Sequence, residues 1–298
     1  MKINGIKIDD TFAEAFPMQA TRILITAQDR HWAAIAAEAM TGFATSSLVC
    51  GCEAGIEREL SPDETPDARP GFAILLFAMN SEKLTKQLQS RVSQCVLMTA
   101  TSACFAGIHN NQPVPLGSLL RYFGDGWQVS KVINGKRYWR IPVMEGEFVC
   151  EETTGLVSAI GGSNFFILAT TPSSALAAAE IAIEAMRHLP NIIMPFPGGI
   201  VRAGFKFSSR YKNLMLSTNH LFCPTLKGQV NSALDRETDA VLEIVINGLS
   251  EIDIQQAMRV GIQSVCALGR ESGVTRISAG NYGGEMGSFQ FHLQEILA

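Results

Sequence analysis

Apolar runs of strand length alternate along the chain with segments of helical periodicity, and the alternation occurs twice. Residues 23–27 form a short apolar run typical of a strand, and an alanine-rich helix is predicted from about residue 32 to residue 40. The same plan returns 142 residues later, with a strand at 165–169 and a helix over 175–186. This shift predicts that one pattern is used twice within the chain.

A second pair of segments repeats at a shift of 170 residues. Residues 72–79 and residues 242–249 are both apolar runs followed by a segment of helical character. Each of the four predicted helices follows a residue suited to cap it: Asp29, Asn80, Thr171 (with Pro172 in the first turn) and Ser250. Each half therefore has the split βαβ plan. We predict an α+β fold of two ferredoxin-like lobes, over residues 1–155 and 156–298.

The segment between the two halves has a different pattern. From about residue 117 to residue 152, strand-like runs are separated by glycine-containing turns, and Asn134-Gly135 is a strong hairpin signal. The predicted runs are 119–123, 129–133, 138–143 and 147–149. We interpret this segment as a β-meander inserted in the N-terminal lobe, suited to serve as an arm or a dimer contact.

Composition narrows the class of protein. The 298 residues are 47% hydrophobic but only 17% charged, with a formal net charge of −4, which excludes a mainly disordered chain and argues against nucleic-acid binding. No apolar stretch is long enough to cross a membrane, and the N-terminus lacks the features of a signal peptide. Seven scattered cysteines indicate a reduced, cytoplasmic protein. The low charge favours a buried interface with a partner or with other copies.

The sequence lacks the motifs of several common kinds of catalytic and binding site. It has no glycine-rich dinucleotide loop, no phosphate-binding loop, no serine nucleophile elbow and no zinc-protease motif. Cys50 and Cys52 stand alone, so we expect no metal site. His220 and Cys223 could form a base and a nucleophile, which leaves a thiol-dependent acyltransferase as one alternative.

Glycine and small polar residues gather in three places, at 41–46, 195–199 and 278–284. Such turns let a ligand approach the backbone closely, although each can also be an ordinary tight turn.

Glu243 is the strongest single candidate for a catalytic residue, because it is the one carboxylate in the apolar strand 242–246. If it is drawn into the interior, desolvation raises its pKa and lets it donate a proton at neutral pH. The alternative is a strand-end glutamate that faces water or an arginine.

Long strings of residues make the chain similar to the formylmethanofuran:tetrahydromethanopterin formyltransferases over nearly its whole length. These strings include residues 10–16, 41–46, 53–57, 64–67, 120–126, 195–201, 222–227, 243–249 and 277–284. The resemblance implies two ferredoxin-like lobes and direct formyl exchange between the amine of methanofuran and a ring nitrogen of tetrahydromethanopterin. It implies no tightly bound cofactor, since both carriers act as co-substrates. The family's active-site glutamate matches Glu243.

From the resemblance and from glycine content we expect a set of residues to contact substrate. They are Thr45, Ser46, Pro197, Gly198, Gly199, Asn219, Asn247, Asn281, Tyr282, Gly283 and Gly284. The resemblance also implies either a homotetramer or one subunit of a formyltransferase/hydrolase complex, and the low charge is closer to the version in methylotrophic bacteria. A non-catalytic scaffold subunit is the remaining alternative. Ala68 departs from the glycine usual in the family and puts the conformation of its loop in doubt.

Overall fold

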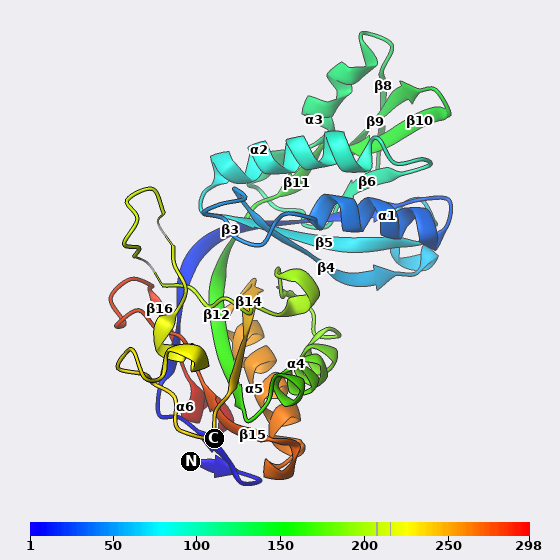
Figure 1. The fold of residues 1–298 in the computed structure, drawn as a ribbon. Coiled ribbons are helices and arrows are strands. Elements are labelled where there is room, and N and C mark those ends of the chain that lie inside the picture. Colours follow the sequence, from blue (N-terminus) through cyan, green and yellow to red (C-terminus); the bar gives the residue numbers. More distant parts are fainter. Residues whose placement is uncertain (207, 215) are drawn as a thin grey trace. The chain divides into compact units, whose positions relative to one another are not determined.

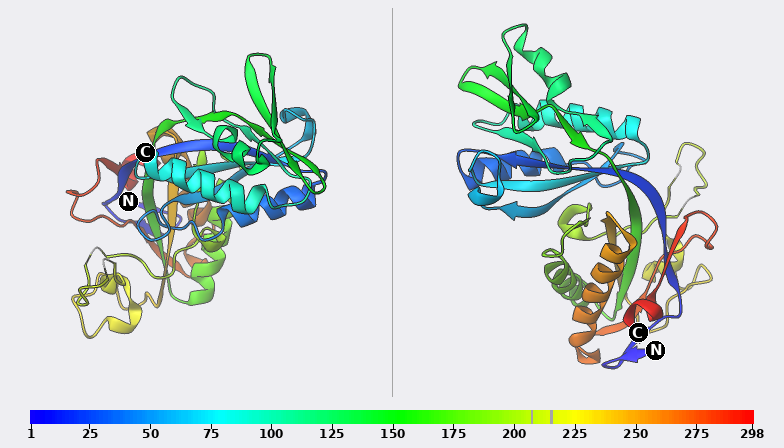
Figure 2. Two further views of the ribbon diagram at one scale, coloured as in Figure 1. Left: turned by 90° about the horizontal axis from the view of Figure 1, so that it is seen from above. Right: turned by 180° about the vertical axis from the view of Figure 1, so that it is seen from behind.

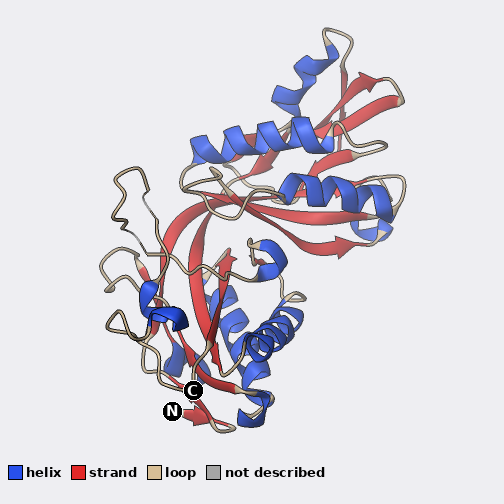
Figure 3. Cartoon of the chain, viewed as in Figure 1, coloured by secondary structure: helices blue, strands red, loops and turns tan. Residues whose placement is uncertain are grey.

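The computed structural model describes residues 1–206, 208–214 and 216–298 (Figure 1). Its contacts divide the chain into two compact units, one over Met18–Ala159 and one made of Met1–Pro17 together with Ile160–Ala298. Both units combine helices with a sheet, so the expected mixture of α and β structure is confirmed (Figure 3). Within the described residues, no helix is both long and apolar enough to span a bilayer.

The first 17 residues are grouped differently from the expected lobe of residues 1–155. They pack with the C-terminal half because β2 (Ile6–Ile8) pairs in parallel with β15 (Val274–Ser278). Also, β16 (Phe289–His292) pairs with the start of β3 (Phe12–Thr26). Pairing across so many residues leaves no local sequence signal, which is why the pattern of residues 1–17 did not indicate it.

The unit Met18–Ala159 is built on four antiparallel strands and two helices. In chain order these are the end of β3, α1 (Arg30–Thr41), β4 (Glu53–Leu60), β5 (Gly71–Ala78), α2 (Ser81–Arg91) and β6 (Ala103–Ala106). In space the strands follow the order β4-β5-β3-β6. The apolar side chains of Ile23, Ile25, Ile74 and Leu76 are buried with those of α1 and α2 in one core.

The other unit repeats this plan. Its elements are β12 (Val157–Ala169), α4 (Pro172–Met186), β13 (Ile192–Ile193), β14 (Ala240–Gly248), α5 (Glu251–Ala267) and β15. The strands follow the order β13-β14-β12-β15, which is the same succession of second, third, first and fourth strand. Helices α4 and α5 lie side by side (Figure 2), and this unit also holds β1 (Lys2–Ile3) and α6 (Leu293–Leu297).

The four predicted helix starts are confirmed. The side chains of Asp29, Asn80, Thr171 and Ser250 each accept a hydrogen bond from a backbone N–H of the first turn. Such caps satisfy donors that have no partner within the helix, and each stabilises its helix by about 1 kcal/mol. They determine where each helix leaves the preceding strand.

The inserted segment is a meander only in part. It contains α3 (Gly117–Leu120), β8 (Val129–Ile133), β9 (Lys136–Val143) and β10 (Gly146–Glu151). The short strands β7 (Pro113–Pro115) and β11 (Thr153–Gly155) flank it and pair with each other. The β8–β9 hairpin is confirmed, and Asn134 and Gly135 both have the positive φ that its two-residue turn needs. The prediction of a strand over 119–123 is wrong. This stretch is helical because Leu120, one turn after Leu116, buries its side chain with that of Leu116.

The sheet of the second unit has one face for the core and one for the candidate site. Phe165, Ile167, Ile244, Ile246 and Ile277 pack in one cluster with the buried side chains of α4 and α5. Because successive strand residues point to opposite faces, the residues between these point away from the helices. That second face carries Glu243.

Ala68 has a left-handed backbone conformation, with φ at 55°, on an exposed loop. A side chain costs about 1–2 kcal/mol in this conformation, and glycine gives back about 0.5–1 kcal/mol through its greater freedom when unfolded. We therefore expect Ala68→Gly to stabilise the protein by about 0.5–1 kcal/mol, measured by urea unfolding. Ala34→Gly, in the middle of α1, is the control and should destabilise by about 1 kcal/mol. A lower unfolding midpoint for Ala68→Gly would contradict the argument.

Candidate active site

Three neighbouring strands bring one row of side chains together on the face away from the helices. Phe166 of β12 is paired with Glu243 of β14 on one side and with Ser278 of β15 on the other. Asn164 lies two residues from Phe166 and therefore on the same face. Glu243 lies on the face opposite Ile244, whose side chain packs in the core cluster.

This row forms the floor of a cleft of about 720 Å³, a volume in the range of small-molecule sites. Glu243, Phe166 and Asn164 line it together with Asn219 and Phe222 from the long segment before β14. The rings of Phe166 and Phe222 meet edge to face, with centroids 4.8 Å apart. The cleft thus combines aromatic surface with hydrogen-bonding groups.

Glu243 is the most perturbed acid of the cleft. It is only 6% exposed, and its Oε2 atom is buried without a hydrogen-bond partner among the described residues. Burial raises the pKa of this carboxyl from 4.5 to about 8. Its backbone N–H and C=O are both bonded to Val201, which keeps the strand position rigid. At neutral pH most molecules hold Glu243 as an acid able to donate a proton.

The segment after β15 supplies another wall of the cleft. Asn281 and Tyr282 both line it, and the Gly280 N–H donates to Asn164 Oδ1 at 2.7 Å. Burial raises the pKa of the Tyr282 phenol, and the nearby charges of Glu243 and Glu14 raise it further. The phenol is therefore a neutral hydrogen-bonding group beside Glu243.

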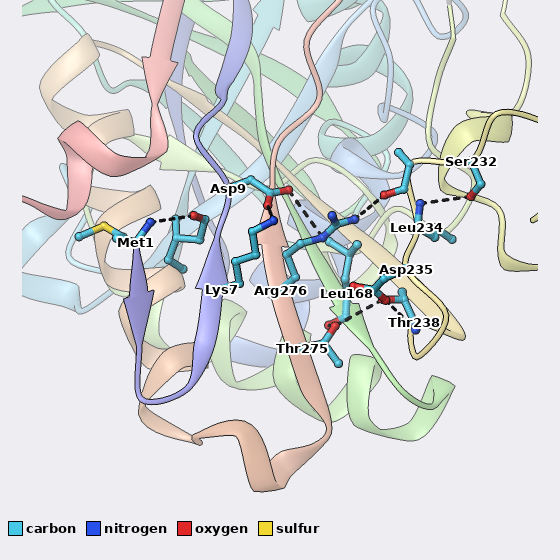
Figure 4. Close-up of polar contacts among 12 residues, drawn as sticks. Met1, Lys7, Asp9, Leu168, Ser232, Leu234, Asp235, Thr238, Thr275 and Arg276 are labelled. Atoms are coloured by element: carbon cyan, nitrogen blue, oxygen red, sulfur yellow. Dashed lines mark hydrogen bonds and ion pairs between the residues drawn. The ribbon is translucent and has the colours of Figure 1, made fainter.

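Charged residues gather at the part of the cleft formed by β2 and β15. Figure 4 shows Lys7 and Arg276 directed at the carboxylate of Asp9, with nitrogen–oxygen distances of 3.1 and 3.6 Å. Arg276 also donates to the carbonyl of Ala233 at 2.6 Å. Lys7, Asp9 and Arg276 all line the cleft, so this part of its wall contains charges of both signs.

The structure brings together only some of the expected contact residues. Asn219, Asn281 and Tyr282 line the cleft with Glu243. Gly283 and Gly284 follow Tyr282 in the same loop. Contacts of these residues with substrate remain predictions.

Other expected residues have structural partners elsewhere. Pro197, Gly198 and Gly199 form a short turn just before Val201, the residue that bonds the Glu243 backbone. Asn247 is completely buried, and its Oδ1 atom accepts from Gly162 N at 2.9 Å in the bulge of β12. Thr45 and Ser46 belong to the other unit, after α1. Their part in binding substrate remains a prediction.

The thiol alternative finds little support. The Cys223 thiol donates to the carbonyl of Asn219, and the His220 ring lies 3.5 Å from Lys206 Nζ. In the described ranges no hydrogen bond joins the Cys223 thiol to the His220 ring. The described residues also contain no group of three or more His, Cys, Asp or Glu side chains arranged to hold a metal ion.

Sequence reasoning missed Asn164, Phe166 and Arg276, although all three line the cleft. Phe166 lies in a strand that the sequence indicates only as an apolar run. Arg276 lies in a strand whose bounds the sequence did not indicate. Their role depends on the register that sets Phe166 beside Glu243. Alternation around Glu243 could have selected Phe166 only if the register between β12 and β14 had been known.

Comparison with known proteins agrees with this geometry. The family model for formylmethanofuran-tetrahydromethanopterin formyltransferase matches residues 1–143, and the model for the proximal lobe of the same family matches residues 146–296. Together the two models cover almost the whole chain, so both halves of the family's sequence pattern are present.

Individual relatives are similar over their full lengths. The formylmethanofuran–tetrahydromethanopterin formyltransferase of Methylococcus capsulatus is 63% identical, with 100% of each chain covered. A chain of the formyltransferase/hydrolase complex of Methylorubrum extorquens, solved with methylofuran, has a TM-score of 0.97 at 48% identity, covering 100% of this chain and 99% of that chain. The Methanosarcina barkeri enzyme has a TM-score of 0.93 at 44% identity, covering 99% and 100%. The chain therefore belongs to the formylmethanofuran–tetrahydromethanopterin formyltransferase family.

Proposed function

We propose that this protein transfers a formyl group between the amine of methanofuran and a ring nitrogen of tetrahydromethanopterin. One observation carries the proposal beyond family membership: the buried carboxyl of Glu243 has a pKa of about 8 and lines a cleft large enough for a carrier headgroup. Its Oε2 atom has no hydrogen-bond partner among the described residues. The two carriers act as co-substrates, and no tightly bound cofactor takes part. Formyl exchange needs a group that manages one proton, and Glu243 is suited to that task.

The reaction begins when the acceptor nitrogen attacks the formyl carbon, forming a new C–N bond and a tetrahedral adduct. The carbonyl oxygen gains negative charge in this step, and the protonated Glu243 stabilises it by donating a hydrogen bond. The adduct collapses when the original C–N bond breaks. As this bond breaks, Glu243 gives its proton to the leaving nitrogen. The carboxylate that results takes the proton of the attacking nitrogen, so Glu243 returns to its acid form.

Formyl transfer by the purified full-length chain tests the proposal. Formyl-tetrahydromethanopterin and methanofuran are mixed with the protein, and the pterin absorbance is followed. Turnover that requires both carriers supports the function. No turnover, either alone or after the hydrolase subunits have been added, would overturn it.

Substitution of Cys223 separates this mechanism from thiol catalysis. We expect Cys223→Ala to retain kcat within about threefold, since the thiol bonds only to Asn219 and Thr218 among the described residues. A nucleophilic cysteine would instead lose nearly all activity, typically by a factor of 10³ or more. Steady-state kinetics of the wild type and the variant distinguish these outcomes. A loss of that size would support thiol catalysis by Cys223.

We infer that each unit is a ferredoxin-like lobe and that the two arose by duplication. The common strand order β4-β5-β3-β6 and β13-β14-β12-β15, with a helix after the first and third strand of each, supports this inference. The lobes would extend over residues 1–155 and 156–298, with residues 1–17 contributing strands to the second.

We also propose that the protein works in the cytoplasm as a homotetramer or within a formyltransferase/hydrolase complex, rather than as a scaffold without activity. The exposed aromatic side chains of Tyr122, Phe123 and Trp127 support a surface that another chain covers. Light scattering of the purified chain measures its mass, and a monomer that also fails to bind hydrolase subunits would contradict this proposal.

A further inference from the structure

Glu14 is a buried carboxylate that the chemistry above does not use. It lies on β3, in the part of that strand that packs with residues 160–298, and its residue exposure is 0%. Among the described residues no lysine, arginine or histidine pairs with it. A carboxylate in such a place is costly unless hydrogen bonds replace the lost water.

Four backbone N–H groups provide those hydrogen bonds. Glu14 Oε2 accepts from Tyr282 N at 2.7 Å and from Gly284 N at 3.1 Å. Oε1 accepts from Met286 N at 2.6 Å and from Gly287 N at 2.5 Å. Burial by itself would raise the pKa of Glu14, but the four hydrogen bonds together hold it below 4.5. The side chain is therefore ionised at neutral pH, with both oxygens fully engaged.

The four donors belong to one loop without helix or strand. Residues 279–288 connect β15 to β16, and their N–H groups have no ladder to bond to. The loop also lies directly on β3, since a Cβ at Gly287 would come within 2.4 Å of the Ala15 carbonyl oxygen. The Glu14 carboxylate therefore accepts the hydrogen bonds that the carbonyl groups of a neighbouring strand would accept in a sheet.

The same loop is a wall of the candidate cleft. Asn281, Tyr282 and Met286 line the cleft together with Glu243. The Tyr282 ring lies 6.1 Å from that of Phe16, two residues after Glu14. A shift of the loop would move Tyr282 and Asn281 relative to Glu243 without disturbing the strand that carries Glu243.

We propose that Glu14 is a positioning residue: by holding four amides of residues 282–287 it sets the shape of the cleft wall against which a carrier binds. This inference rests on the proposed function for its substrate but not for its geometry. Glu14 is not among the described residues that line the cleft, so its loss acts on carrier binding more than on the chemical step.

Glu14→Gln in the full-length chain is the direct test. Glutamine has the same shape, but its NH₂ group faces two of the four N–H donors and cannot accept from them. We expect KM for at least one carrier to rise about tenfold or more, while kcat at saturation falls less than about threefold. Glu14→Asp retains the charge with a shorter reach and should give a smaller rise in KM.

Glu151→Gln is the matched control. Glu151 is also buried, at 3% exposure, and accepts from Ala106 N at 3.0 Å, but it lies in the unit Met18–Ala159. It should lower the unfolding midpoint and leave both KM values unchanged. If Glu14→Gln behaves in the same way, with unchanged KM values, Glu14 only stabilises the fold and the proposal is overturned.

Hydrogen exchange keeps the test independent of activity. In the wild type the amides of residues 282, 284, 286 and 287 should be protected, and Glu14→Gln or Glu14→Asp should speed their exchange at least tenfold while β12 and β14 stay protected. Faster exchange throughout the protein, or unchanged exchange in the loop, would count against the proposal. If the wild type itself transfers no formyl group, the proposed function fails, and these exchange rates still decide whether Glu14 holds the wall.

Discussion

Glu243→Gln is expected to lower kcat by about 10²–10³-fold, with KM for either carrier changed less than about fivefold. Glutamine preserves the size and most of the polarity of the side chain but has no proton to transfer. General acid catalysis contributes about 10²–10⁴-fold, and one hydrogen-bond donor to an oxyanion contributes about 10²–10³-fold. The amide of glutamine can still donate a hydrogen bond, which is why the expected loss is not larger.

Steady-state rates with both carriers varied give kcat and KM separately. Glu151→Gln is again the control, since it makes the same chemical change at a buried carboxyl in the other unit and should keep kcat within about threefold. A Glu243→Gln protein that is folded and turns over at a rate within tenfold of the wild type would remove Glu243 from the proton-transfer mechanism.

The second large effect of Glu243→Gln is on the free energy of unfolding, which the substitution is expected to increase as the pH rises. The pKa of Glu243 is about 8 in the folded protein, and the ordinary value of 4.5 applies when the chain is unfolded. Between these values the folded state holds a proton that the unfolded state has released, so raising the pH favours unfolding. The linkage relation gives a loss of about 1.4 kcal/mol for each pH unit in this window.

Glu243→Gln removes this dependence, so the variant should gain stability over the wild type as the pH rises from about 5 to about 8, by about 4 kcal/mol at the upper end. Urea unfolding of both proteins at pH 5, 6.5 and 8 measures the difference. The acids with lowered pKa, Glu14, Glu59 and Glu64, act below pH 4.5 and cancel in the comparison. Parallel stability curves would show that Glu243 is not buried as an acid.

The helices of the fold were predictable because their signals are local. A capping side chain, an apolar spacing and a following run all lie within a few residues, as at Asp29 and Ser250. The placement of residues 1–17 could not be predicted, because it depends on β15 and β16, far away in the chain. The strand prediction for residues 119–123 failed for a local reason, since their composition is strand-like but Leu120 packs on Leu116 one turn before it.

The residues of the candidate site also differ in whether their sequence signal is local. Glu243 could be selected because a lone carboxylate in an apolar strand is conspicuous in the sequence itself. Phe166 and Ser278 could not, because their importance comes from the register that places them in one row with it. Glu14 sits in an alternating strand where a charged residue usually faces water, and only the loop that covers it changes that expectation.

The discontinuous unit has a consequence for how the protein folds as it is synthesised. Residues 18–159 contain every strand of their own sheet, so that unit can complete its pairing before the second half has left the ribosome. Residues 6–8 emerge before this unit but pair with a strand that ends at residue 278. They must therefore stay available until residue 278 has left the ribosome, and closing this contact of high sequence separation is expected to be among the last steps of folding.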